Sequence, residues 1–383
     1  MDFIDSQKKI MVIFGTRPEA IKLAPVIHEL KTVFKTVVVS TSQHLDLLKP
    51  VLNLFEIEVD HELKVMTKNQ TPHRVCARSL EKLDKIITAE KPDLILVQGD
   101  TTTTLSGALA GFYHRIPVGH IEAGLRSGNI YSPFPEEMNR QLVSKIATYH
   151  FAATKGNRDN LLAEGIPTER VFVTGNPIVD ALKSFLEKLS PSEKILSLIK
   201  ETEGKKRVLL TTHRRESFGE TMRQNLIVLR DFVAKHKNLC LIFPVHLNPK
   251  VKDLTCEVLS GQERVYLLEP LNYGDFIFLM KSSWLIVSDS GGVQEEAPSL
   301  GKPVLILRDT TERPEAIQAG VAKLVGGSPQ KLKQMLETNY SVETWIKSVK
   351  EVANPFGDGR ASKRILKILL DEVFQSKKSR ASS

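Results

Sequence analysis

The chain has 383 residues, enough for two domains of ordinary size, and its 41% hydrophobic and 26% charged residues are typical of a globular protein rather than a disordered one. No apolar run reaches the roughly 18 residues that a membrane span needs, and residues 1–9 lack the apolar core of a signal peptide, so we expect a cytoplasmic protein. The net charge of +8 is mild, and the 6% aromatic residues do not alternate with basic ones, which argues against nucleic acid as a partner.

The first half of the chain alternates apolar strands with helical segments. A strand predicted over 8–14 leads into the sequence GTRPE (15–19), and a helix with one apolar face follows over 20–31. Arg17 and Lys22 stand near the start of that helix, where the helix dipole and the two cations would attract a phosphate. The simpler interpretation is that both are surface cations, which is the commoner role.

Two successive strands of the first half end in carboxylates. After a strand over 36–40 and a helix that ends at Glu90, the strands over 92–97 and 117–121 lead to Asp100 and Glu122. Ligands of open α/β sheets bind at the carboxyl ends of the strands, so both side chains are candidate site residues. Alternatively, Asp100 caps the helix that follows it and Glu122 forms an ion pair with Arg126.

A third carboxylate, Glu136, lies in a loop that two prolines make rigid, ahead of a helix predicted over 138–147. Strands over 150–153 and 171–174, with a helix over 157–164 between them, complete the first half.

The second half repeats this alternation, with strands predicted over 207–210, 239–243 and 265–268. Polar segments with His213 and His246 follow the first two of these strands. A helix predicted over 273–281 carries Phe276.

Residues 285–307, LIVSDSGGVQEEAPSLGKPVLIL, predict a strand, a glycine turn, a short helix and a second strand. Ser290, Gly291 and Gly292 at the start of the helix leave backbone N–H groups unshielded, which makes an anion site that usually takes phosphate. A carboxylate of Glu295 or Glu296 can then accept from sugar hydroxyls. Alternatively, the glycines form only a turn and the glutamates favour the helix dipole.

Two sets of strands with polar exits predict two α/β domains that face one central cleft. We place the first domain at 8–176 and the second at 177–358, with a disordered tail at 375–383. The three cysteines form no CxxC pair, so neither a disulfide framework nor a metal site is expected.

Motifs spread over residues 8–370 resemble those of the non-hydrolysing UDP-N-acetylglucosamine 2-epimerases. In chain order they are FGTRPEAIKLAPV (14–26), QGDTTTTL (98–105), HIEAGLRSG (120–128), YSPFPEEMNR (131–140), THRRESFG (212–219), PVHLNP (244–249), DSGGVQEEAPSLGKPVL (289–305) and RDTTERPEA (308–316). The resemblance implies two Rossmann-like domains in the GT-B arrangement, with the helix over 361–374 returning to the first domain.

The family interconverts UDP-N-acetylglucosamine (UDP-GlcNAc) and UDP-N-acetylmannosamine (UDP-ManNAc). The resemblance implies that UDP is eliminated to give 2-acetamidoglucal and then added back, without a cofactor. It further implies a homodimer that supplies activated N-acetylmannosamine for cell-surface polysaccharide synthesis.

The resemblance also assigns roles to the candidate residues. Asp100, Glu122 and Glu136 become the acid/base groups, with His213 at the reacting end. The UDP-sugar is bound by a set of residues that hold its phosphates, ribose and uracil: Arg17, Lys22, Phe276, Ser290, Gly291, Gly292, Glu296 and Arg313.

A second, activating UDP-GlcNAc site is linked in bacterial members to the positions of Gln43, His44, Gln70 and His246. The family usually reads QHRE at the first of these positions, whereas this chain has Gln43-His44-Leu45-Asp46, so the match to the second site is incomplete. Two enzymatic alternatives remain open: a hydrolysing epimerase that releases N-acetylmannosamine, and a GT-B glycosyltransferase. A binding module without activity is a third.

Overall fold

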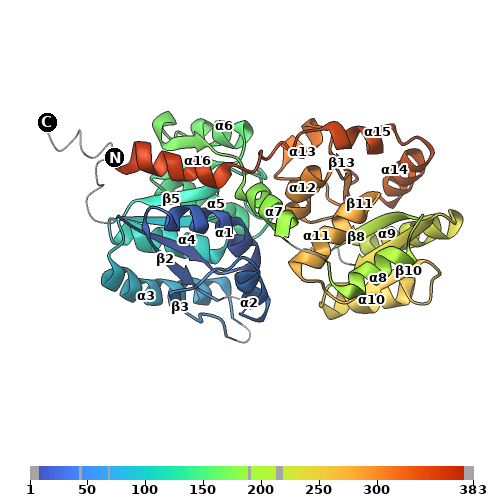
Figure 1. Ribbon diagram of the computed structural model, residues 1–383, viewed down its shortest axis with the longest axis horizontal. Coiled ribbons are helices and arrows are strands. Elements are labelled where there is room, and N and C mark those ends of the chain that lie inside the picture. Colours follow the sequence, from blue (N-terminus) through green and yellow to red (C-terminus); the bar gives the residue numbers. More distant parts are fainter. Residues whose placement is uncertain (1–7, 43–44, 68–69, 189–190, 213–218, 375–383) are drawn as a thin grey trace. The chain divides into compact units, whose positions relative to one another are not determined.

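The computed structural model describes residues 8–42, 45–67, 70–188, 191–212 and 219–374, and it divides into two compact units (Figure 1). Unit 1 comprises the chain up to Ser184 and from Phe356 onward, and unit 2 comprises Phe185–Pro355. The division therefore falls eight residues after the boundary expected at 176, inside helix α7 (Pro177–Lys188).

Unit 1 is built on a seven-stranded parallel sheet in the order β3-β2-β1-β4-β5-β6-β7. Its strands are β1 (Lys9–Phe14), β2 (Lys35–Ser40), β3 (His61–Glu62), β4 (Leu94–Gln98), β5 (Val118–Ala123), β6 (Tyr149–Ala152) and β7 (Val171–Val173). All residues of β4 and β5 are buried, as expected for central strands that helices cover on both faces.

Helices connect these strands. They are α1 (Arg17–Lys31), α2 (Leu45–Leu54), α3 (Pro72–Glu90), α4 (Thr102–Tyr113), α5 (Glu136–Ile146), α6 (Lys155–Ala163), α7, and α16 (Ala361–Ile368), which continues as a π-helical turn over Leu369–Phe374. α4 packs between α3 and α5, and α1 packs against α16. The rings of Phe34 and Phe374 lie 5.2 Å apart, so the segment after α16 also contacts the end of the α1 region.

The start of α16 is fastened to α7 by one buried carboxylate. Asp180 accepts hydrogen bonds from the backbone N of Ala361 (3.1 Å) and from the backbone N (2.8 Å) and hydroxyl (2.6 Å) of Ser362. Because the first N–H groups of a helix have no partner within it, Asp180 serves α16 as a cap supplied from a distant part of the sequence.

Unit 2 contains a six-stranded parallel sheet in the order β10-β9-β8-β11-β12-β13. The strands are β8 (Lys206–Thr211), β9 (Leu239–Pro244), β10 (Val265–Leu268), β11 (Leu285–Ser288), β12 (Val304–Ile306) and β13 (Ala322–Leu324). The helices are α8 (Glu193–Glu201), α9 (Glu220–Lys235), α10 (Pro249–Leu259), α11 (Tyr273–Ser282), α12 (Gly291–Glu296), α13 (Pro314–Gln318), α14 (Pro329–Ser341) and α15 (Thr344–Ser348). These two parallel α/β sheets confirm the expected fold class.

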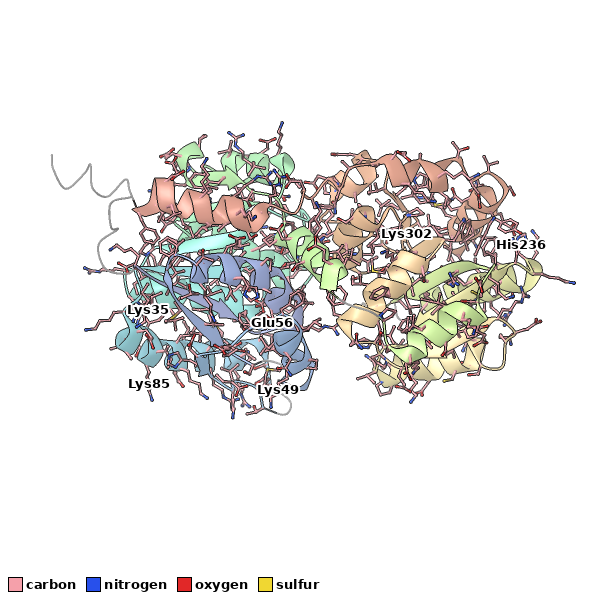
Figure 2. All side chains as sticks on the ribbon, in the orientation of Figure 1. Lys35, Lys49, Glu56, Lys85, His236 and Lys302 are labelled. Carbon is pink, nitrogen blue, oxygen red and sulfur yellow. The ribbon has the colours of Figure 1, made fainter. Side chains whose placement is uncertain are left out.

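An aromatic cluster closes the amino-terminal edge of the unit 2 sheet. The ring of His236, labelled in Figure 2, lies 3.9 Å from that of Tyr340, and the Lys206 ammonium lies 4.7 Å from the Tyr340 ring. Glu343 pairs with Lys206 at 2.7 Å, so the cation is compensated. The residues at the amino-terminal ends of these strands therefore form a packed structural cluster. The polar segments that follow the strands lie at the opposite, carboxyl-terminal ends.

Each sheet reverses its strand order at one point, between β1 and β4 in unit 1 and between β8 and β11 in unit 2. The loops that leave such neighbouring strands diverge to opposite sides and open a crevice at the carboxyl ends, which is the usual ligand position in this architecture. The residues after β4 include Asp100, and those after β11 begin the serine-glycine turn. Within the described part of the chain, no helix is both long and apolar enough to cross a membrane.

Candidate active site

Glu122 is turned inward by an irregularity at the end of β5. The register between β5 and β6 shifts between Ile121 and Ala123, and Glu122 has a φ of +64°. A bulge of this kind re-aims a side chain, and a glutamate in the left-handed region carries a conformational cost of order 1 kcal/mol. Glu122 is 7% exposed, so the local backbone places a carboxylate in the interior beside the strand ends.

Among the residues that the structure describes, Lys22, Gln98 and Asn176 contact the Glu122 carboxylate. The ammonium of Lys22 donates to both of its oxygens, at 2.6 and 2.7 Å, and Gln98 donates from its amide nitrogen. Asn176 Nδ2 lies 3.5 Å from Oε1. Lys22 is itself buried, so each charge of this pair compensates the other, and removing one would cost about 3–5 kcal/mol.

The expected alternative role of Glu122, an ion pair with Arg126, is wrong. Arg126 instead binds both carboxylate oxygens of Glu164, at 2.6 and 2.8 Å. The positive φ of Glu122 directs the Glu122 side chain toward Lys22 of α1 and away from Arg126. Lys22, which the sequence suggested as a residue that binds a phosphate, instead pairs with Glu122 within unit 1.

Asp100 is held by two neighbouring residues of α5. Arg140 donates from Nη2 to the Asp100 carboxylate and from Nη1 to Glu137 at 2.7 Å, while Asn139 Nδ2 donates to the Asp100 carbonyl at 2.9 Å. The alternative in which Asp100 caps the next helix is wrong, because the cap of α4 is Thr101, whose hydroxyl accepts from Thr104 N at 3.2 Å. The Asp100 carboxylate is therefore left to face Arg140.

Glu136 is the first residue of α5 rather than part of the loop before it, which corrects the expected helix start at Met138. Pro135 precedes the helix, and acidic residues favour the first turn because of the helix dipole. Residues three or four positions apart share a helix face. Glu136 thus lies one turn from Asn139 and Arg140, on the face that holds Asp100.

The turn before Asp100 is held by a neutral histidine. His120 lies fully buried in β5 with Nε2 at 2.7 Å from the Gly99 carbonyl oxygen, which can only accept, so Nε2 carries the proton. Burial lowers the pKa of His120 to about 3, partly opposed by this hydrogen bond. Gly99 has a φ of +76°, a conformation that glycine adopts without strain, and the turn leads directly to Asp100.

In unit 2, the turn after β11 packs against a guanidinium that is already paired. Ser290 precedes α12, and the ideal Cβ of a residue at Gly291 would lie 2.6 Å from Arg313 Nη1. At Gly292 the nearest atom that it would meet among the described residues is the Ser290 hydroxyl, at 3.9 Å. Arg313 donates to Glu295 at 2.6 Å and lies 3.3 Å from Glu312. Gly291 thus makes room for Arg313, and Gly292 leaves the start of α12 open.

Glu296 is positioned by α11. The Tyr273 hydroxyl donates to Glu296 Oε1 at 2.8 Å, and both residues are more than 90% buried. Phe276, one turn after Tyr273 on α11, is partly exposed. The structure therefore brings Glu296 next to the helix that carries Phe276.

The other candidate residues are spread over both units. Arg17 begins α1 and is exposed, and Gln70 Oε1 accepts from Thr67 N at 3.0 Å. His246 is exposed in unit 2, with Nδ1 accepting from Asn248 N at 3.2 Å. Gln43, His44 and His213 lie outside the described residues.

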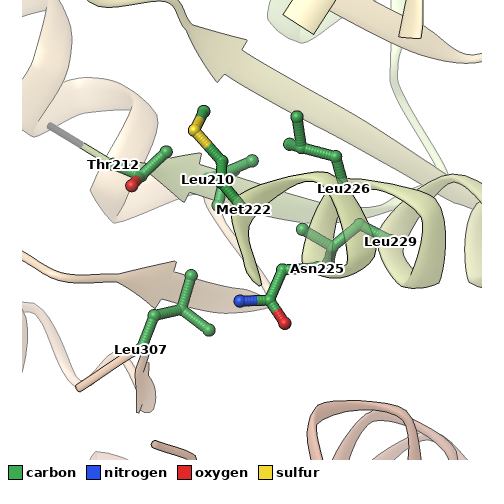
Figure 3. Close-up of a pocket in the computed structure, with 7 residues that line it drawn as sticks. All are labelled: Leu210, Thr212, Met222, Asn225, Leu226, Leu229 and Leu307. Atoms are coloured by element: carbon green, nitrogen blue, oxygen red, sulfur yellow. The ribbon is translucent and has the colours of Figure 1, made fainter. Parts of the chain in front are cut away.

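A small cavity lies near the carboxyl end of β8 (Figure 3). It has a volume of about 10 Å³, and apart from Thr212 and Asn225 its lining is apolar. That volume holds about one water molecule, so the cavity is too small for a nucleotide.

Sequence reasoning missed the partners of the candidate carboxylates, namely Gln98, Arg140, Asn139 and Asn176, together with Glu137. A usable signal existed for α5, where Glu136, Asn139 and Arg140 recur at helical spacing on one face. For Gln98 and Asn176 there was none, since only the fold brings them to Glu122.

Comparison with known proteins places this architecture in a class. The family model "UDP-N-acetylglucosamine 2-epimerase" matches residues 28–370. A UDP-N-acetylglucosamine 2-epimerase of Yersinia pestis is 46% identical over 368 residues, covering 94% of this chain and 98% of its own.

Solved structures agree. The structure titled UDP-GlcNAc 2-epimerase from Neisseria meningitidis bound to UDP-GlcNAc superposes with a TM-score of 0.89 at 45% identity, covering 95% of this chain and 100% of its own. The Methanocaldococcus jannaschii enzyme in complex with UDP-GlcNAc and UDP has a TM-score of 0.80 at 34% identity, covering 94% and 99%.

The two parallel α/β units therefore define a protein of the GT-B-like fold class of nucleotide-sugar enzymes. Within that class, the chain belongs to the UDP-N-acetylglucosamine 2-epimerase family, which confirms the resemblance seen in its motifs.

Proposed function

We propose that this enzyme interconverts UDP-GlcNAc and UDP-ManNAc by inverting C2 of the sugar. The observation that carries the proposal is the pair of carboxylates at the carboxyl ends of adjacent strands, Asp100 after β4 and Glu122 on β5, each held by its own cation. The similarity over 94% of the chain to a relative named UDP-N-acetylglucosamine 2-epimerase supports this substrate.

The C2 proton of the substrate is not acidic, so its removal must be coupled to departure of a good leaving group. In the proposed reaction, a base removes the C2 proton, the C–H electrons form the C1–C2 double bond of 2-acetamidoglucal, and the C1–O electrons leave with UDP. Re-addition of UDP to C1 then accompanies protonation of C2 from the opposite face. One group is needed on each face of the ring, and each contributes about 100- to 10,000-fold.

Asp100, Glu122 and Glu136 are the proposed acid/base groups, with His213 beside the reacting end. Lys22 and Arg140 lie against the carboxylates of Glu122 and Asp100 and compensate their negative charges. Glu136, the third acid/base candidate, lies on α5 one turn from the residues that hold Asp100.

The UDP group is proposed to bind unit 2. The open start of α12 at Ser290, Gly291 and Gly292 offers backbone N–H groups to the pyrophosphate, and Arg313 lies against Gly291. Glu296 is proposed to take the ribose and Phe276 to lie by the uracil. Arg17 adds positive charge from unit 1, which would stabilise the leaving UDP.

Further proposals follow from family membership. The product would supply activated N-acetylmannosamine for cell-surface polysaccharide, in the cytoplasm and from a homodimer. Gln43, His44, Gln70 and His246 are proposed to serve an activating UDP-GlcNAc site, with Leu45 in place of the family's usual arginine.

Incubation with UDP-GlcNAc in D2O, followed by proton NMR, tests the reaction and its mechanism together. We expect UDP-ManNAc with deuterium at C2, since the proton lost to a carboxylate exchanges with solvent. Product that retains its original C2 hydrogen would contradict elimination. Accumulation of free N-acetylmannosamine and UDP would instead identify a hydrolysing epimerase, and turnover only with an added sugar acceptor would identify a glycosyltransferase.

A further inference from the structure

Glu19 lies where the strand order of the unit 1 sheet reverses, and none of the proposed chemistry uses it. It is the third residue of α1, and only 3% of it is exposed. Oε2 accepts from the backbone N of Gly15 (2.9 Å), the backbone N of Thr16 (2.7 Å) and the Thr16 hydroxyl (2.8 Å). One carboxylate oxygen thus fixes the loop after β1.

The other oxygen reaches the loop after β4. Oε1 accepts from the Thr101 hydroxyl at 2.7 Å, and the Thr104 hydroxyl lies 3.0 Å away. The Thr104 hydroxyl has a single hydrogen and also lies 2.7 Å from the Gln98 carbonyl, so Thr101 is the constant donor to Oε1. Glu19 therefore joins the two loops that diverge at the reversal of strand order.

A helix-capping role explains only half of this arrangement. The reciprocal contacts of Glu19 with Thr16 form a capping box for α1, which accounts for Oε2. Such a role needs neither burial nor a contact 82 residues away. Burial raises the pKa of Glu19, opposed by its hydrogen bonds to Thr101 and to the loop after β1, so an interior carboxyl is kept here at a cost that capping does not require.

We propose that Glu19 is a positioning residue for Asp100, acting through Thr101. Asp100 lies between Gly99, whose carbonyl is held by His120, and Thr101, whose hydroxyl is held by Glu19. With the Asp100 carbonyl bound by Asn139, the backbone is fixed before, at and after the carboxylate. The proposal rests on the proposed function of Asp100, since a displacement of about 1 Å in a reacting group can cost about 100-fold in rate.

Two substitutions at Glu19 separate positioning from charge. Glu19→Gln can keep the bridge, because its carbonyl can face the N–H groups of Gly15 and Thr16 while its amide donates to the Thr101 and Thr104 oxygens. Glu19→Ala removes the bridge. We expect kcat to fall about 100-fold in Glu19→Ala and by less than about tenfold in Glu19→Gln, because only the alanine variant loses the bridge.

Thr101 provides the matched test, and Thr154 provides the control. Thr101→Val removes the donor to Glu19 and the cap of α4, whereas Thr101→Ser retains both and should recover most of the lost kcat. Thr154 caps α6 in the same way, accepting from Asn157 N at 3.1 Å. Thr154→Val should melt at a lower temperature than the wild type, because α6 loses its cap, and should keep its kcat.

The outcome is decided by kcat and by hydrogen exchange together. Faster amide exchange over residues 99–104 in Glu19→Ala and Thr101→Val, but not in Glu19→Gln, is expected whether or not the enzyme epimerises its proposed substrate. An inactive wild type would therefore overturn the proposed function alone. Unchanged exchange in both Glu19→Ala and Thr101→Val would overturn the positioning role. Equal kcat for Thr101→Val and Thr101→Ser in an active enzyme would also overturn it, and this second comparison does not require that Glu19→Ala folds.

Discussion

Lys22 and Glu122 lie 100 positions apart in the sequence and meet at 2.6 Å. From the sequence, Lys22 near a helix start suggested a phosphate, and Glu122 suggested an ion pair within its own motif. Both residues could be recognised as site candidates, because their positions at strand ends follow from the apolar runs before them. Their pairing could not, since it depends on the bulge in β5 and on β1 and β4 lying side by side.

The three candidate carboxylates should affect turnover rather than substrate binding. Asp100→Asn, Glu122→Gln and Glu136→Gln should each lower kcat at least about 100-fold, as expected for a positioned acid or base, with little rise in KM. Steady-state kinetics, with a melting curve for each variant, provides the measurement.

Glu164→Gln is a suitable control for these variants, because it breaks an ion pair of the same unit, with Arg126, without touching a candidate residue. It should lose stability and retain kcat. Near-normal kcat in all three carboxylate variants would leave the chemistry unassigned and favour the glycosyltransferase alternative.

His120 predicts a specific acid sensitivity. Because burial lowers its pKa to about 3, against about 6.5 for an unfolded histidine, the unfolded chain binds more protons between these pH values and the folded state loses stability as the pH falls from about 6.5 toward 3. The loss is about 1.4 kcal/mol per pH unit for one proton.

His120→Gln, whose amide can still donate to Gly99, should remove this part of the pH dependence. Thermal melting at pH 8, 7, 5.5 and 4.5 measures this difference. The melting temperatures of the wild type and of His120→Gln should change in parallel with pH above pH 7 and should diverge below pH 6.5. Curves that stay parallel throughout would mean that His120 is protonated or exposed in the folded state.

At the level of elements, apolar runs predicted the central strands well. β4, for example, was expected over 92–97 and is found at Leu94–Gln98. The two-residue β3, His61–Glu62, has no apolar run and was not predicted, because only its pairing with β2 makes it a strand. The helix expected over 361–374 is α-helical to Ile368 and then continues as a π-helical turn, which its side-chain periodicity does not reveal.

The glycine turn before α12 offers a graded test of nucleotide binding. Within the described part of the chain, an added Cβ at Gly292 comes no closer than 3.9 Å to another residue, the Ser290 hydroxyl, so Gly292→Ala and Gly292→Val should fold while placing increasing bulk over the helix start. We expect UDP affinity to fall progressively, by at least about tenfold for valine, or ~1.4 kcal/mol, in isothermal titration calorimetry.

Gly291→Ala is the informative comparison, because its methyl group would approach Arg313 to 2.6 Å and should lower stability as well as affinity. Unchanged UDP binding in folded Gly292→Val would show that the serine-glycine segment is only a turn.

For the whole molecule, the fold class could be predicted from the alternation of strands and helices, but the composition of unit 1 from two separate stretches of sequence could not be derived from periodicity. That arrangement depends on contacts such as those of Asp180 with Ala361 and Ser362, across more than 180 positions. The return of the last helix was inferred only from the family resemblance.

Asp180→Ala should therefore destabilise unit 1 by about 2 kcal/mol or more, since it removes three hydrogen bonds to a buried carboxylate. The exposed pair of Asp358 and Arg364 provides the comparison: Asp358→Asn should cost less than about 1 kcal/mol. Differential scanning calorimetry measures both, and equal effects of the two substitutions would contradict the capping role of Asp180.

The packing of α16 against α1 also has a consequence for protein synthesis. Translation at roughly 5–20 residues per second delivers α16 on the order of tens of seconds after α1, and the whole of Phe185–Pro355 emerges from the ribosome in between. Unit 2 thus has all its residues before unit 1 does, although unit 1 begins first. A nascent chain stalled after Pro355 would contain every residue of unit 2, whereas α1 would still lack its partner helix, α16.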